Sequence, residues 1–569
     1  MKALFLHVDY INFKPVRKAL KSVKDLSEEE KKGKNVKDAL AVLIAVEKGD
    51  EIQGSAKELV KNIKDIASQV KTDSIVVYPY AHLSPDLSSP EVAIKVLEET
   101  ENLLQKVKGL RVSRAPFGYY KEFELKVKGH PLAELSREIK IHGKEENSDE
   151  TYDYKQLLRS VGKSVLDRSK LKKNDHRIIG QEMELFSFNE VAPGMVFWNN
   201  NGLIIYNNLM NYIREELRKM EYKEIKTPEI LDKKLWQISG HWEKYKENIF
   251  LTDYEKRTFA AKPMNCPGGM IVFKENSKSY RDLPLRVAEF GIVHRQELSG
   301  VLAGLFRVIE FTQDDAHVFC TEGQLEKEIE NLIDLMKNVY NKFGFDYLVE
   351  LSTRPEKRIG SDRIWDRAEK ELESVLKKNK LKFKINKGDG AFYGPKIDFH
   401  IKDSLGRTWQ LGTIQLDFAM PERFGLEYTD KDNKKKTPVM LHRAIFGSIE
   451  RFIGILLEHT NGRLPTWLAP TQVRILSFTE RNVKHAETII KKLADAIPSL
   501  RVNADFRNVT MQSKVKDAEI MRVPYVIVLG DKEEKKKTLA VREKGSGKIK
   551  SLKFEDFLKS IKEEIEERR

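Results

Sequence analysis

The first part of the chain alternates between two apolar patterns. Short runs at residues 3–10, 74–80 and 122–129 have the apolar, β-branched and aromatic composition of β-strands. Residues 55–70 instead space their apolar side chains as an amphipathic helix does. Strands that alternate with helical stretches are typical of a self-contained α/β or α+β unit. We predict such a domain over residues 1–137.

The last hundred residues alternate in the same way. Strand-like runs at residues 472–478 and 524–530 are separated by helical patterns such as residues 484–497. Residues 555–569 have the pattern of a charged terminal helix. Because this part has the length of one small domain, we predict a second α/β domain over residues 469–569.

Between these two domains the pattern is mixed. Residues 138–180 are polar and rich in lysine, which is typical of a linker that contains some helix. Residues 181–468 hold most of the tryptophans and long segments in which helical and strand patterns follow one another. We predict that these residues form one larger α+β domain.

Residues 286–320 carry the most informative pattern of the middle domain. They have the alternation of two strands joined by a turn segment with glycine and serine. Arg295 and Glu297 fall at the end of the first predicted strand, and Arg307 and Phe311 fall on the second. A guanidinium group offers paired donors to a phosphate, and a nearby aromatic ring can cover a purine. Arginines on a sheet, in place of a glycine-rich loop, predict an unusual way of binding ATP.

Two further segments flank this strand pair. Residues 198–230 have the pattern of a long amphipathic helix and a strand that meets Pro228, which taken alone is ordinary packing. Residues 438–459 predict a strand that turns at Gly447 into an apolar helix carrying Arg451. A helix arginine commonly extends along the surface to reach solvent. The apolar neighbours of Arg451 favour a buried functional arginine instead.

Composition narrows the class of protein. The 569 residues are enough for about three or four domains. Lysine and arginine exceed aspartate and glutamate by 101 − 87 = 14, which favours a polyanionic partner over a merely solvated surface. The two cysteines, Cys266 and Cys320, argue against a disulfide framework and for a reducing compartment. No apolar run reaches the roughly 18 residues that span a bilayer, and an early His and Asp disfavour a secretory signal, so we predict a cytoplasmic protein without membrane association.

Three segments of the middle domain, in their order, resemble the motifs of class II aminoacyl-tRNA synthetases: a helix, strand and proline, then HRQE with a distal arginine, then GSIER. Five stretches resemble threonyl-tRNA synthetases in particular: SGHW at Ser239–Trp242, KPMNCPG at Lys262–Gly268, EFTQDDAHVF at Glu310–Phe319, WQLGTIQLDF at Trp409–Phe418 and LHRAIFGSIERFIG at residues 441–454. The resemblance implies an α+β multidomain protein with an antiparallel-sheet catalytic core over residues 181–468. It also implies that threonine is activated with ATP and transferred to tRNA(Thr).

The resemblance implies that three arginines bind ATP. Arg295 would hold the α-phosphate and the threonine carboxylate, while Arg307 and Arg451 would bind the terminal phosphates together with Mg²⁺. Glu297 and Phe311 would frame the adenine. The threonine carboxylate attacks the α-phosphorus directly, so positioning and charge neutralisation supply the catalysis without a covalent nucleophile.

The resemblance also implies one Zn²⁺ per subunit, held by Cys266, His317 and His442. Their spacing alone is weak support, because each residue singly is more often a packed cysteine or a hydrogen-bonded histidine. Three protein ligands leave an open position, which is the arrangement of a catalytic zinc. The metal can take the amino and hydroxyl groups of threonine, with Asp315 accepting the hydroxyl proton.

A site that binds the threonine hydroxyl distinguishes threonine from valine, which has nearly the same shape. Such a site rejects the analogue without the hydroxyl by roughly ten-thousand-fold. Serine lacks only a methyl group, which is worth about 1–3 kcal/mol, so mischarging and editing are expected. His241 matches a histidine near the terminal ribose of the tRNA, where it would aid the transfer. The resemblance places five more residues around the substrates: Gln313, Tyr393, Gln410, Thr413 and Gln415.

The first domain resembles the editing domain of archaeal threonyl-tRNA synthetases, an α/β relative of D-aminoacyl-tRNA deacylases. The stretches that carry this resemblance are YPYAHLS at Tyr78–Ser84, PFGYYKEFEL at Pro116–Leu125 and KGHPLAELSR at Lys128–Arg137. Hydrolysis of serine from mischarged tRNA is implied. The matching site residues are His82, Tyr120, Lys121 and Glu134. Singly, such residues on strands and turns are usually solvated surface groups.

The last domain resembles the α/β anticodon-binding domain of this group of synthetases. Asn508, Glu533 and Arg542 match positions that read anticodon bases, and ordinary surface residues are the alternative for each. The positive net charge suits phosphate contacts that position a tRNA while polar side chains read unstacked bases. Since the first motif forms the subunit interface of class II enzymes, a homodimer is expected.

Two other interpretations stay open. A regulatory or RNA-binding protein derived from a synthetase would keep the fold without the chemistry, although no motif arginine or zinc ligand is missing. A synthetase for serine or proline is disfavoured by the Cys–His–His set together with QDDAH. Pyrophosphate exchange with threonine, serine and valine separates these alternatives.

Overall fold

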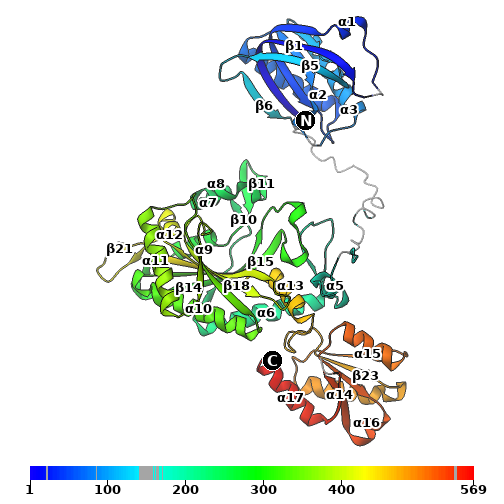
Figure 1. Cartoon of the computed structure of the whole chain (residues 1–569), viewed down its shortest axis with the longest axis vertical. Coiled ribbons are helices and arrows are strands. Elements are labelled where there is room, and N and C mark those ends of the chain that lie inside the picture. The colour runs from blue at the N-terminus through cyan, green and yellow to red at the C-terminus, as the bar shows by residue number, and fades with distance from the viewer. Residues whose placement is uncertain are drawn as a thin grey trace. The chain divides into compact units, whose positions relative to one another are not determined.

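The structure is a computed structural model of the chain (Figure 1), which describes residues 1–20, 23–84, 86–139, 158, 161, 166–169, 171–543 and 547–569. The chain divides into two compact units, Met1–Asp153 and Tyr154–Arg569. Much of the predicted linker lies outside the described residues, and its last residues belong to helix α5 (His176–Glu182).

The first unit is a mixed sheet with crossover helices. Its strands are β1 (Lys2–Lys18), β2 (Lys34–Ala45), β3 (Ser74–Pro79), β4 (Arg111–Arg114), β5 (Tyr119–Val127) and β6 (Glu134–Glu138). Its helices are α1 (Glu28–Lys31), α2 (Ile52–Val70), the 3₁₀ turn η1 (Ala81–Leu83) and α3 (Pro90–Gln105). The strand order is β4-β3-β2-β1-β5, with β6 also paired to β1. Strands β2, β3 and β4 run parallel, as their helical connections require, and β1 is antiparallel to its partners.

Alternation along these strands gives the sheet two apolar faces. Phe5 and Val77 pack in one core with residues of α2 and α3. Their neighbours Leu6 and Val76 lie in a second cluster on the opposite face. A sheet covered on both faces explains why residues 74–80 are almost continuously apolar. The predicted α/β character of this domain is therefore confirmed.

The second unit contains a large central sheet, for which the antiparallel prediction is confirmed. The strand order is β17-β16-β18-β19-β22-β15-β14-β9, in which only the β14–β9 and β16–β17 pairs are parallel. These strands are β9 (Lys223–Glu224), β14 (Leu285–His294), β15 (Glu310–Cys320), β16 (Asp346–Ser352), β17 (Phe383–Asn386), β18 (Lys396–Lys402), β19 (Thr408–Asp417) and β22 (Val439–Ser448). The shorter strands of this domain are β7 (Phe186–Ser187), β8 (Phe197–Trp198), β10 (Ile230–Asp232), β11 (Leu251–Tyr254), β12 (Arg257–Ala261), β13 (Lys278–Ser279), β20 (Tyr428–Thr429) and β21 (Lys435–Lys436).

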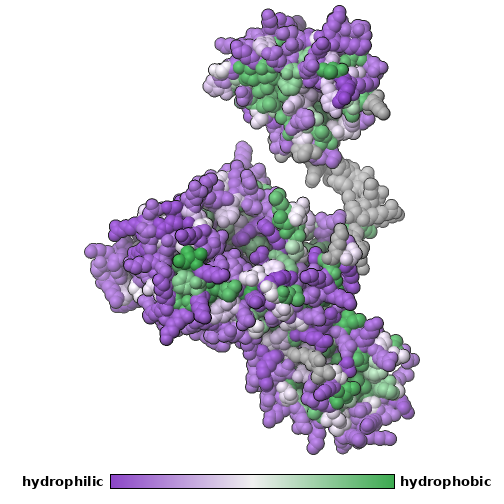
Figure 2. Space-filling view, viewed as in Figure 1, coloured by the Kyte–Doolittle hydropathy of each residue, from purple (hydrophilic) through white to green (hydrophobic). Residues whose placement is uncertain are grey.

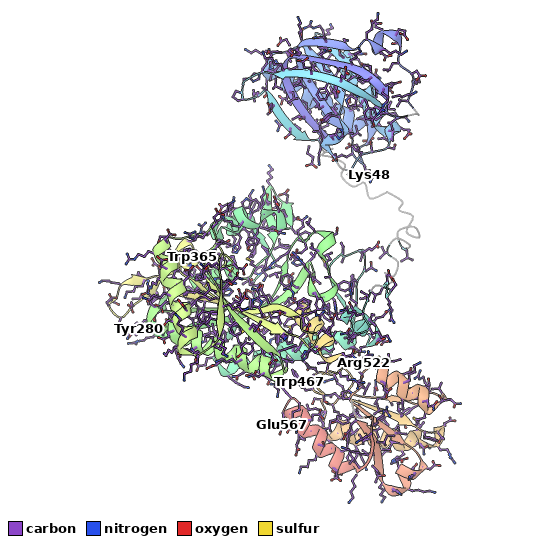
Figure 3. All side chains as sticks on the ribbon, in the orientation of Figure 1. Lys48, Tyr280, Trp365, Trp467, Arg522 and Glu567 are labelled. Carbon is purple, nitrogen blue, oxygen red and sulfur yellow. The ribbon has the colours of Figure 1, made fainter. Side chains whose placement is uncertain are left out.

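The helices of this domain are α5, α6 (Asn200–Lys219), α7 (Lys233–Ser239), α8 (His241–Tyr245), α9 (Cys266–Lys274), α10 (Leu325–Lys342), α11 (Asp362–Lys378), α12 (Ala419–Arg423) and α13 (Ile449–Thr460). Of these, α5, α6, α10, α11 and α13 contribute apolar residues to the core of the central sheet. The 3₁₀ turns are η2 (Lys246–Asn248), η3 (Tyr280–Asp282), η4 (Ser299–Val301), η5 (Gly304–Phe306) and η6 (Glu322–Gln324). Trp365 of α11 (labelled in Figure 3) is buried and donates its indole N–H to the carbonyl of Ile359 at 2.8 Å. The aromatic ring thus fills the core while its polar atom is satisfied.

Most predictions for the three motif segments are confirmed, and one is wrong. Helix α6 leads to strand β9, and β22 turns at Gly447, whose φ is +71°, into α13. Phe311 lies on β15 as expected. Arg307 does not, because the chain from Ser299 to Phe306 forms two 3₁₀ turns and β15 begins only at Glu310.

The last hundred residues form a smaller sheet of order β24-β23-β25-β26-β27 (Figure 1). Its strands are β23 (Val473–Ser477), β24 (Val502–Asp505), β25 (Tyr525–Leu529), β26 (Thr538–Glu543) and β27 (Ile549–Lys553). Its helices are the 3₁₀ turn η7 (Glu480–Asn482), α14 (Val483–Ala496), α15 (Met511–Ile520), α16 (Asp531–Lys536) and α17 (Phe554–Glu566). Strand β23 is parallel to both β24 and β25, which confirms the predicted α/β alternation.

The face of the molecule drawn in Figure 2 is mostly hydrophilic, with apolar residues gathered in a few patches. Across the described part of the chain, no helix combines the length and apolar character needed to cross a bilayer.

Candidate functional site

Neighbouring strands of the central sheet place the predicted residues in rows. Gln415 of β19 pairs with His442 of β22, which pairs with His317 of β15. Two positions further along, Thr413 and Asp315 pair with one shared residue of β22. Because side chains two apart on a strand share a face, these residues project from one face of the sheet. The order Gln-x-Asp-x-His in β15 is thus a strand pattern with its chemistry on every second residue.

The residue between them, Asp314, points to the opposite face and holds β15 against β22. Its buried carboxylate lies 3.2 Å from Nη1 of Arg443 and accepts the backbone N–H groups of Ile445, Phe446 and Gly447 at 2.8, 3.0 and 2.9 Å. Burial raises the pKa of Asp314 to about 6 although Arg443 and these N–H groups act in the other direction. The clamp fixes the turn at which β22 enters α13.

A pocket of about 340 Å³ opens on the face of the sheet from which Thr413 and Gln415 project. Nine predicted residues line it: Arg295, Glu297, Arg307, Phe311, Gln313, Gln410, Thr413, Gln415 and Arg451. They come from two strands (β15 and β19), one helix and the loop before β15, so the fold gathers residues that lie up to about 150 positions apart in the chain.

Guanidinium groups give the pocket a positive wall. Nη2 of Arg307 lies 2.7 Å from the Glu297 carboxylate, and Nε of Arg451 donates to the carbonyl of Phe306 at 2.8 Å. Burial lowers the pKa of Arg295, and burial together with Arg307 and Arg295 lowers the pKa of Arg451. Positive charges that repel one another in a half-buried pocket favour a polyanion such as a triphosphate.

Aromatic rings form another wall of the pocket. The guanidinium carbon of Arg295 lies 5.1 Å from the centre of the Phe311 ring. Phe306, which also lines the pocket, packs against Trp409 with the ring centres 4.5 Å apart and the planes tilted by 40°. Phe306 was not predicted as a site residue, although it is an aromatic residue directly before Arg307 in the turn segment.

The predicted metal ligands meet at one end of the same rows, where His317 pairs with His442. Ligand atoms of Cys266, His317 and His442 lie within 4.8 Å of one another, and all three residues are buried. Cys266 is the first residue of α9, and the two imidazole rings meet edge to face at 5.0 Å.

The chemistry of these three side chains fits a zinc ion. Nε2 of His317 is buried without a hydrogen-bond partner among the described residues. Burial, Asp315 and Asp417 raise the pKa of the Cys266 thiol well above its ordinary value, a charge pattern that a bound cation would reverse. A thiolate and two imidazoles match the N and S donors that zinc prefers, and three ligands leave one position open.

A carboxylate orients one of the ligands. Nε2 of His442 lies 3.0 Å from Oδ2 of Asp417, which is fully buried at the end of β19. A hydrogen bond of this kind fixes the tautomer and direction of a metal-binding imidazole. The sequence analysis missed Asp417, although it lies two residues after Gln415 on the same strand.

Tyr393 and His241 lie beside this cluster. The Tyr393 hydroxyl donates to Oε1 of Gln415 at 2.5 Å, and its ring lies 4.9 Å from that of His442. Nδ1 of His241 lies 2.8 Å from the hydroxyl of Ser239, and its ring is 6.3 Å from Tyr393. Burial lowers the pKa of His241 to about 3, so its imidazole is neutral near pH 7.

A second group of potential metal ligands, Asp175, His176 and Glu458, is structural instead. Nδ1 of His176 lies 2.7 Å from the Glu458 carboxylate, and Nε2 accepts the backbone N–H of Leu305 at 3.0 Å. With both ring nitrogens satisfied, His176 ties α5 and α13 to the turn before β15.

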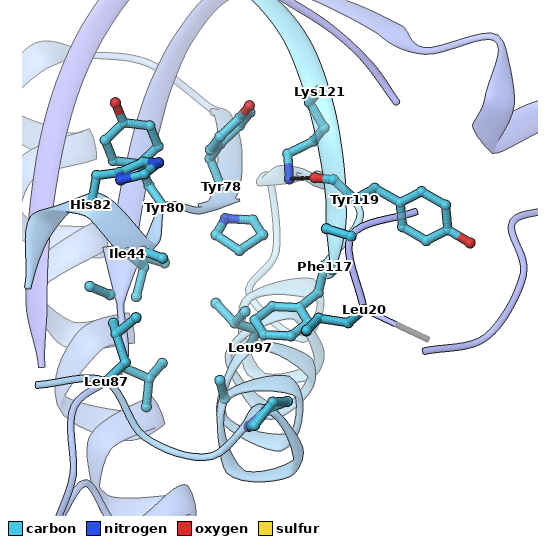
Figure 4. A pocket seen from close by; sticks show the side chains of 18 of the residues that line it. Leu20, Ile44, Tyr78, Tyr80, His82, Leu87, Leu97, Phe117, Tyr119 and Lys121 are labelled. Carbon is cyan, nitrogen blue, oxygen red and sulfur yellow. Dashed lines mark hydrogen bonds between the residues drawn. The ribbon is translucent and has the colours of Figure 1, made fainter. Parts of the chain in front are cut away.

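The first unit has its own pocket, of about 540 Å³ (Figure 4). His82, Tyr120 and Lys121 of the predicted editing set line it. Nζ of Lys121 donates to the carbonyls of Pro116 and Tyr119 at 2.9 and 3.1 Å, and burial lowers the pKa of its ammonium group to about 8.

The walls of this pocket differ in polarity. In Figure 4 the rings of Tyr78, Tyr80 and His82 lie along one side with Lys121, and apolar side chains such as Leu97 lie on the other. The sequence analysis missed both tyrosines as pocket residues, although the alternation Tyr-x-Tyr-x-His was visible in the motif.

Glu134, the fourth predicted editing residue, does not line the pocket. It opens β6, where it pairs with Leu6 of β1, and it borders a separate hollow with Lys128 and His130. The assignment of Glu134 to the editing site therefore stays a prediction.

The predicted anticodon residues fall in two places. Asn508 follows β24 and Glu533 lies in the first turn of α16, after β25, both beyond the carboxyl ends of parallel strands. Arg542 instead pairs with Val526, near the start of β25, and forms an ion pair with Glu519. The role of all three residues stays a prediction.

Comparison with known protein families covers most of the chain. Residues 1–139 match the archaea-specific editing domain of threonyl-tRNA synthetase. Residues 245–460 match the class II tRNA synthetase core domain of the G, H, P, S and T enzymes, and residues 472–564 match an anticodon-binding domain.

Individual relatives point the same way. A threonine–tRNA ligase of Desulforamulus reducens is 51% identical over 395 residues, which are 69% of this chain and 62% of that protein. One of Acetivibrio thermocellus is 51% identical over 421 residues, 72% of this chain and 66% of that protein, so the chain spans about two thirds of the length of these relatives or slightly less.

Two solved structures are similar. One, the RNA binding domain of threonyl-tRNA synthetase from Cryptosporidium parvum, has a TM-score of 0.66 and 41% identity and covers 68% of this chain and 98% of that one. The other, a putative threonyl-tRNA synthetase from Aeropyrum pernix, has a TM-score of 0.60 and 30% identity and covers 69% and 96%.

Proposed function

Because the chain belongs to the threonyl-tRNA synthetase family, we propose that it is a threonine–tRNA ligase, which joins threonine to tRNA(Thr) at the expense of ATP. The observation that carries this proposal is the gathering of nine predicted substrate residues in one pocket beside the Cys–His–His cluster. A protein that had kept the fold without the chemistry would have no reason to retain this constellation intact.

The proposed roles follow from position and charge. Arg295, whose guanidinium group lies over the Phe311 ring, would bind both the α-phosphate of ATP and the carboxylate of threonine and so hold the two reacting groups together. Arg307 and Arg451 would neutralise the terminal phosphates and the Mg²⁺-bound leaving group, with Phe311 and Glu297 framing the adenine. Fixed donors around an in-line displacement lower its barrier because they need no reorganisation during the reaction.

Cys266, His317 and His442 would hold the zinc ion, which when bound supplies a Lewis acid for the amino and hydroxyl groups of threonine. Asp315 lies next to this cluster, 3.8 Å from Nε2 of His317, and would accept the hydroxyl proton. Gln313, Gln410 and Thr413 complete the lining, with the Tyr393–Gln415 hydrogen bond holding one wall in place. His241, neutral and buried nearby, would serve the ribose end of the tRNA.

Pyrophosphate exchange tests this function. We expect exchange that depends on threonine, a weaker reaction with serine and almost none with valine, because a site that binds the hydroxyl rejects valine by roughly ten-thousand-fold. Absence of threonine-dependent exchange in zinc-loaded protein would refute the proposal, and exchange with serine or proline alone would assign another synthetase.

We also propose that the first unit hydrolyses Ser-tRNA(Thr). Its support is the family match over residues 1–139 and the pocket that joins His82, Tyr120 and Lys121. We expect Lys121→Ala and His82→Ala to accumulate Ser-tRNA that the parent protein clears, whereas Lys61→Ala, on the exposed side of α2, leaves clearance unchanged. Equal clearance by all these variants would refute the site.

The remaining expectations are proposals of the same kind. We propose that tRNA(Thr), ATP and threonine are the partners, that Asn508, Glu533 and Arg542 take part in reading the anticodon, and that the enzyme works as a cytoplasmic homodimer. We further propose the boundaries 1–137, 181–468 and 469–569 for its domains. Mass measurement of the intact assembly tests the dimer directly.

A further inference from the structure

The anticodon-binding domain has a topological switch point at its central strand. From β23 the chain crosses to β24 on one side, and from β24 it crosses back to β25 on the other side. The connections that leave β23 and β25 therefore diverge beyond the carboxyl ends of these two strands. In open α/β sheets such a crevice is where ligands bind.

Phe478 lies at this crevice with its ring exposed. It follows the last residue of β23, and its backbone N–H donates to the carbonyl of Leu529 at the end of β25 at 2.8 Å. The side chain is 63% exposed. An aromatic ring whose backbone is held in place and whose face is open to solvent offers a flat apolar surface to a ligand.

The exposure of Phe478 is unusual for its domain. The large apolar side chains exposed there, among described residues, are Phe478, Val509, Ile520 and Ile549, and only the first is aromatic. Val509 follows Asn508 in the loop after β24, at the same edge of the sheet.

Polar groups frame the ring. A Cβ built on Gly530 would lie 3.4 Å from Cβ of Phe478 and 3.1 Å from Oε2 of Glu533, so the ring and the carboxylate flank one glycine. That carboxylate accepts the backbone N–H of Gly530 at 3.1 Å. On the buried side, Nζ of Lys514, which is 3% exposed, donates to the carbonyl of Ser477 at 2.9 Å and adds a positive charge behind the edge.

We infer that Phe478 is the stacking platform for one unpaired base of the tRNA anticodon loop, held between the hydrogen-bonding groups of Asn508 and Glu533. Aromatic rings in RNA-binding domains stack on splayed bases while neighbouring polar groups read their edges. The flat exposed ring, the Glu533 carboxylate on the other side of Gly530 and the Lys514 ammonium group behind the edge suit a base better than an aliphatic partner. This inference rests on the proposed function.

The test is aminoacylation by the full-length chain with unmodified tRNA(Thr) transcript. We expect Phe478→Ala to raise the KM for tRNA by about 5- to 150-fold, the value of one base stack, with little change in kcat. Phe478→Trp should keep the parent KM because it restores a ring. Ile549→Ala, at a residue that is 62% exposed on the far strand β27, is the matched control and should keep it too.

A coupling experiment separates stacking from a structural role. Each anticodon nucleotide is replaced in turn by an abasic one, and the KM is measured with the parent and with Phe478→Ala. We expect one abasic position at which the two losses do not add, and quenching of the added indole in Phe478→Trp by an anticodon stem-loop that carries that base. A KM that Phe478→Ala leaves within twofold, or losses that add at all positions, would overturn the inference.

The two failures are distinguishable. If the parent protein shows no threonine-dependent exchange, the proposed function itself is wrong. If exchange and charging are normal but Phe478→Ala has no effect, only the stacking role is wrong.

Discussion

At the scale of single residues, the site depends on side chains that never touch a substrate. Asp417 is the clearest case, since its buried carboxylate accepts from the ring of His442. A hydrogen bond of this kind fixes the tautomer and direction of the imidazole. Lys121 differs, because it lines the pocket of the first unit itself, where two carbonyls accept from its ammonium group and burial lowers the pKa of that group.

Asp417→Asn should weaken zinc binding by about 10- to 100-fold, because the amide is a poorer partner for the His442 ring. The measurement is competition with a chelator, read as zinc content rather than as activity. Asp432→Asn, at a solvent-exposed acid of the β20–β21 hairpin, is the control. Identical zinc retention by the two variants would show that Asp417 has no part in holding the metal.

We expect the rate of Ser-tRNA hydrolysis to fall as the pH rises through about 8, because Lys121 then loses its proton. Burial lowers the pKa of the ammonium group to that value, so its positive charge is present below pH 8 and lost above it. The measurement is the enzyme-dependent rate of Ser-tRNA hydrolysis between pH 6.5 and 9, after subtraction of the spontaneous rate, which rises with pH.

The same shift affects stability with the opposite sign. The unfolded chain keeps the Lys121 proton up to about pH 10.5, so between pH 8 and 10.5 it binds more protons than the folded chain and folding becomes more favourable as pH rises.

For the clearance experiment, a rate of Ser-tRNA hydrolysis that stays constant through pH 8 would argue against a role for the charged form of Lys121.

At the scale of elements, the site is a property of strand register. The β15–β22 pair carries two of the proposed metal ligands, His317 and His442, on one face and the Asp314–Arg443 clamp on the other. Because side chains alternate along a strand, β15 places site residues on one face and the carboxylate that stabilises the turn on the other.

Asp314→Ala should destabilise the second unit by about 3–5 kcal/mol, because it leaves the Arg443 guanidinium buried without its ion-pair partner and frees the backbone N–H groups of the turn. Denaturant unfolding followed by tryptophan fluorescence measures this. Asp334→Ala, at an exposed side chain on α10, should change the midpoint little. Equal midpoints for the two variants would contradict the role of the clamp.

Much of this element structure was predictable from the sequence, and the exceptions have physical causes. Short strand-like runs identified β1, β3 and β5, and the apolar segment around Arg451 identified β22 and α13. Arg307 was placed on a strand because periodicity does not reveal 3₁₀ turns. Asp417 and the rows of paired residues were missed because pairing between distant strands leaves no local signal.

At the scale of the whole molecule, two units with separate cores carry two proposed reactions. The first unit has apolar clusters on both faces of its own sheet, and the catalytic core has a separate cluster. Each unit buries its own apolar surface, so each has the means to fold alone.

Residues 154–569 produced alone should therefore charge tRNA with threonine at a rate close to that of the full chain, while Ser-tRNA accumulates. Adding residues 1–139 as a separate protein should restore some clearance. The measurement is the ratio of seryl to threonyl product at equal amino acid concentrations. A fragment that discriminates against serine as well as the full chain would place editing elsewhere.

The rows of paired residues across β19, β22 and β15 also limit how this protein and its relatives can diverge in sequence. A single residue inserted or deleted between His442 and Gly447 would turn every later side chain of β22 to the other side of the sheet. Substitutions along these strands can be repaired one at a time, but a change of length cannot. We therefore expect homologous enzymes to gain and lose residues in connections such as the β20–β21 hairpin and to keep the spacing within these strands constant.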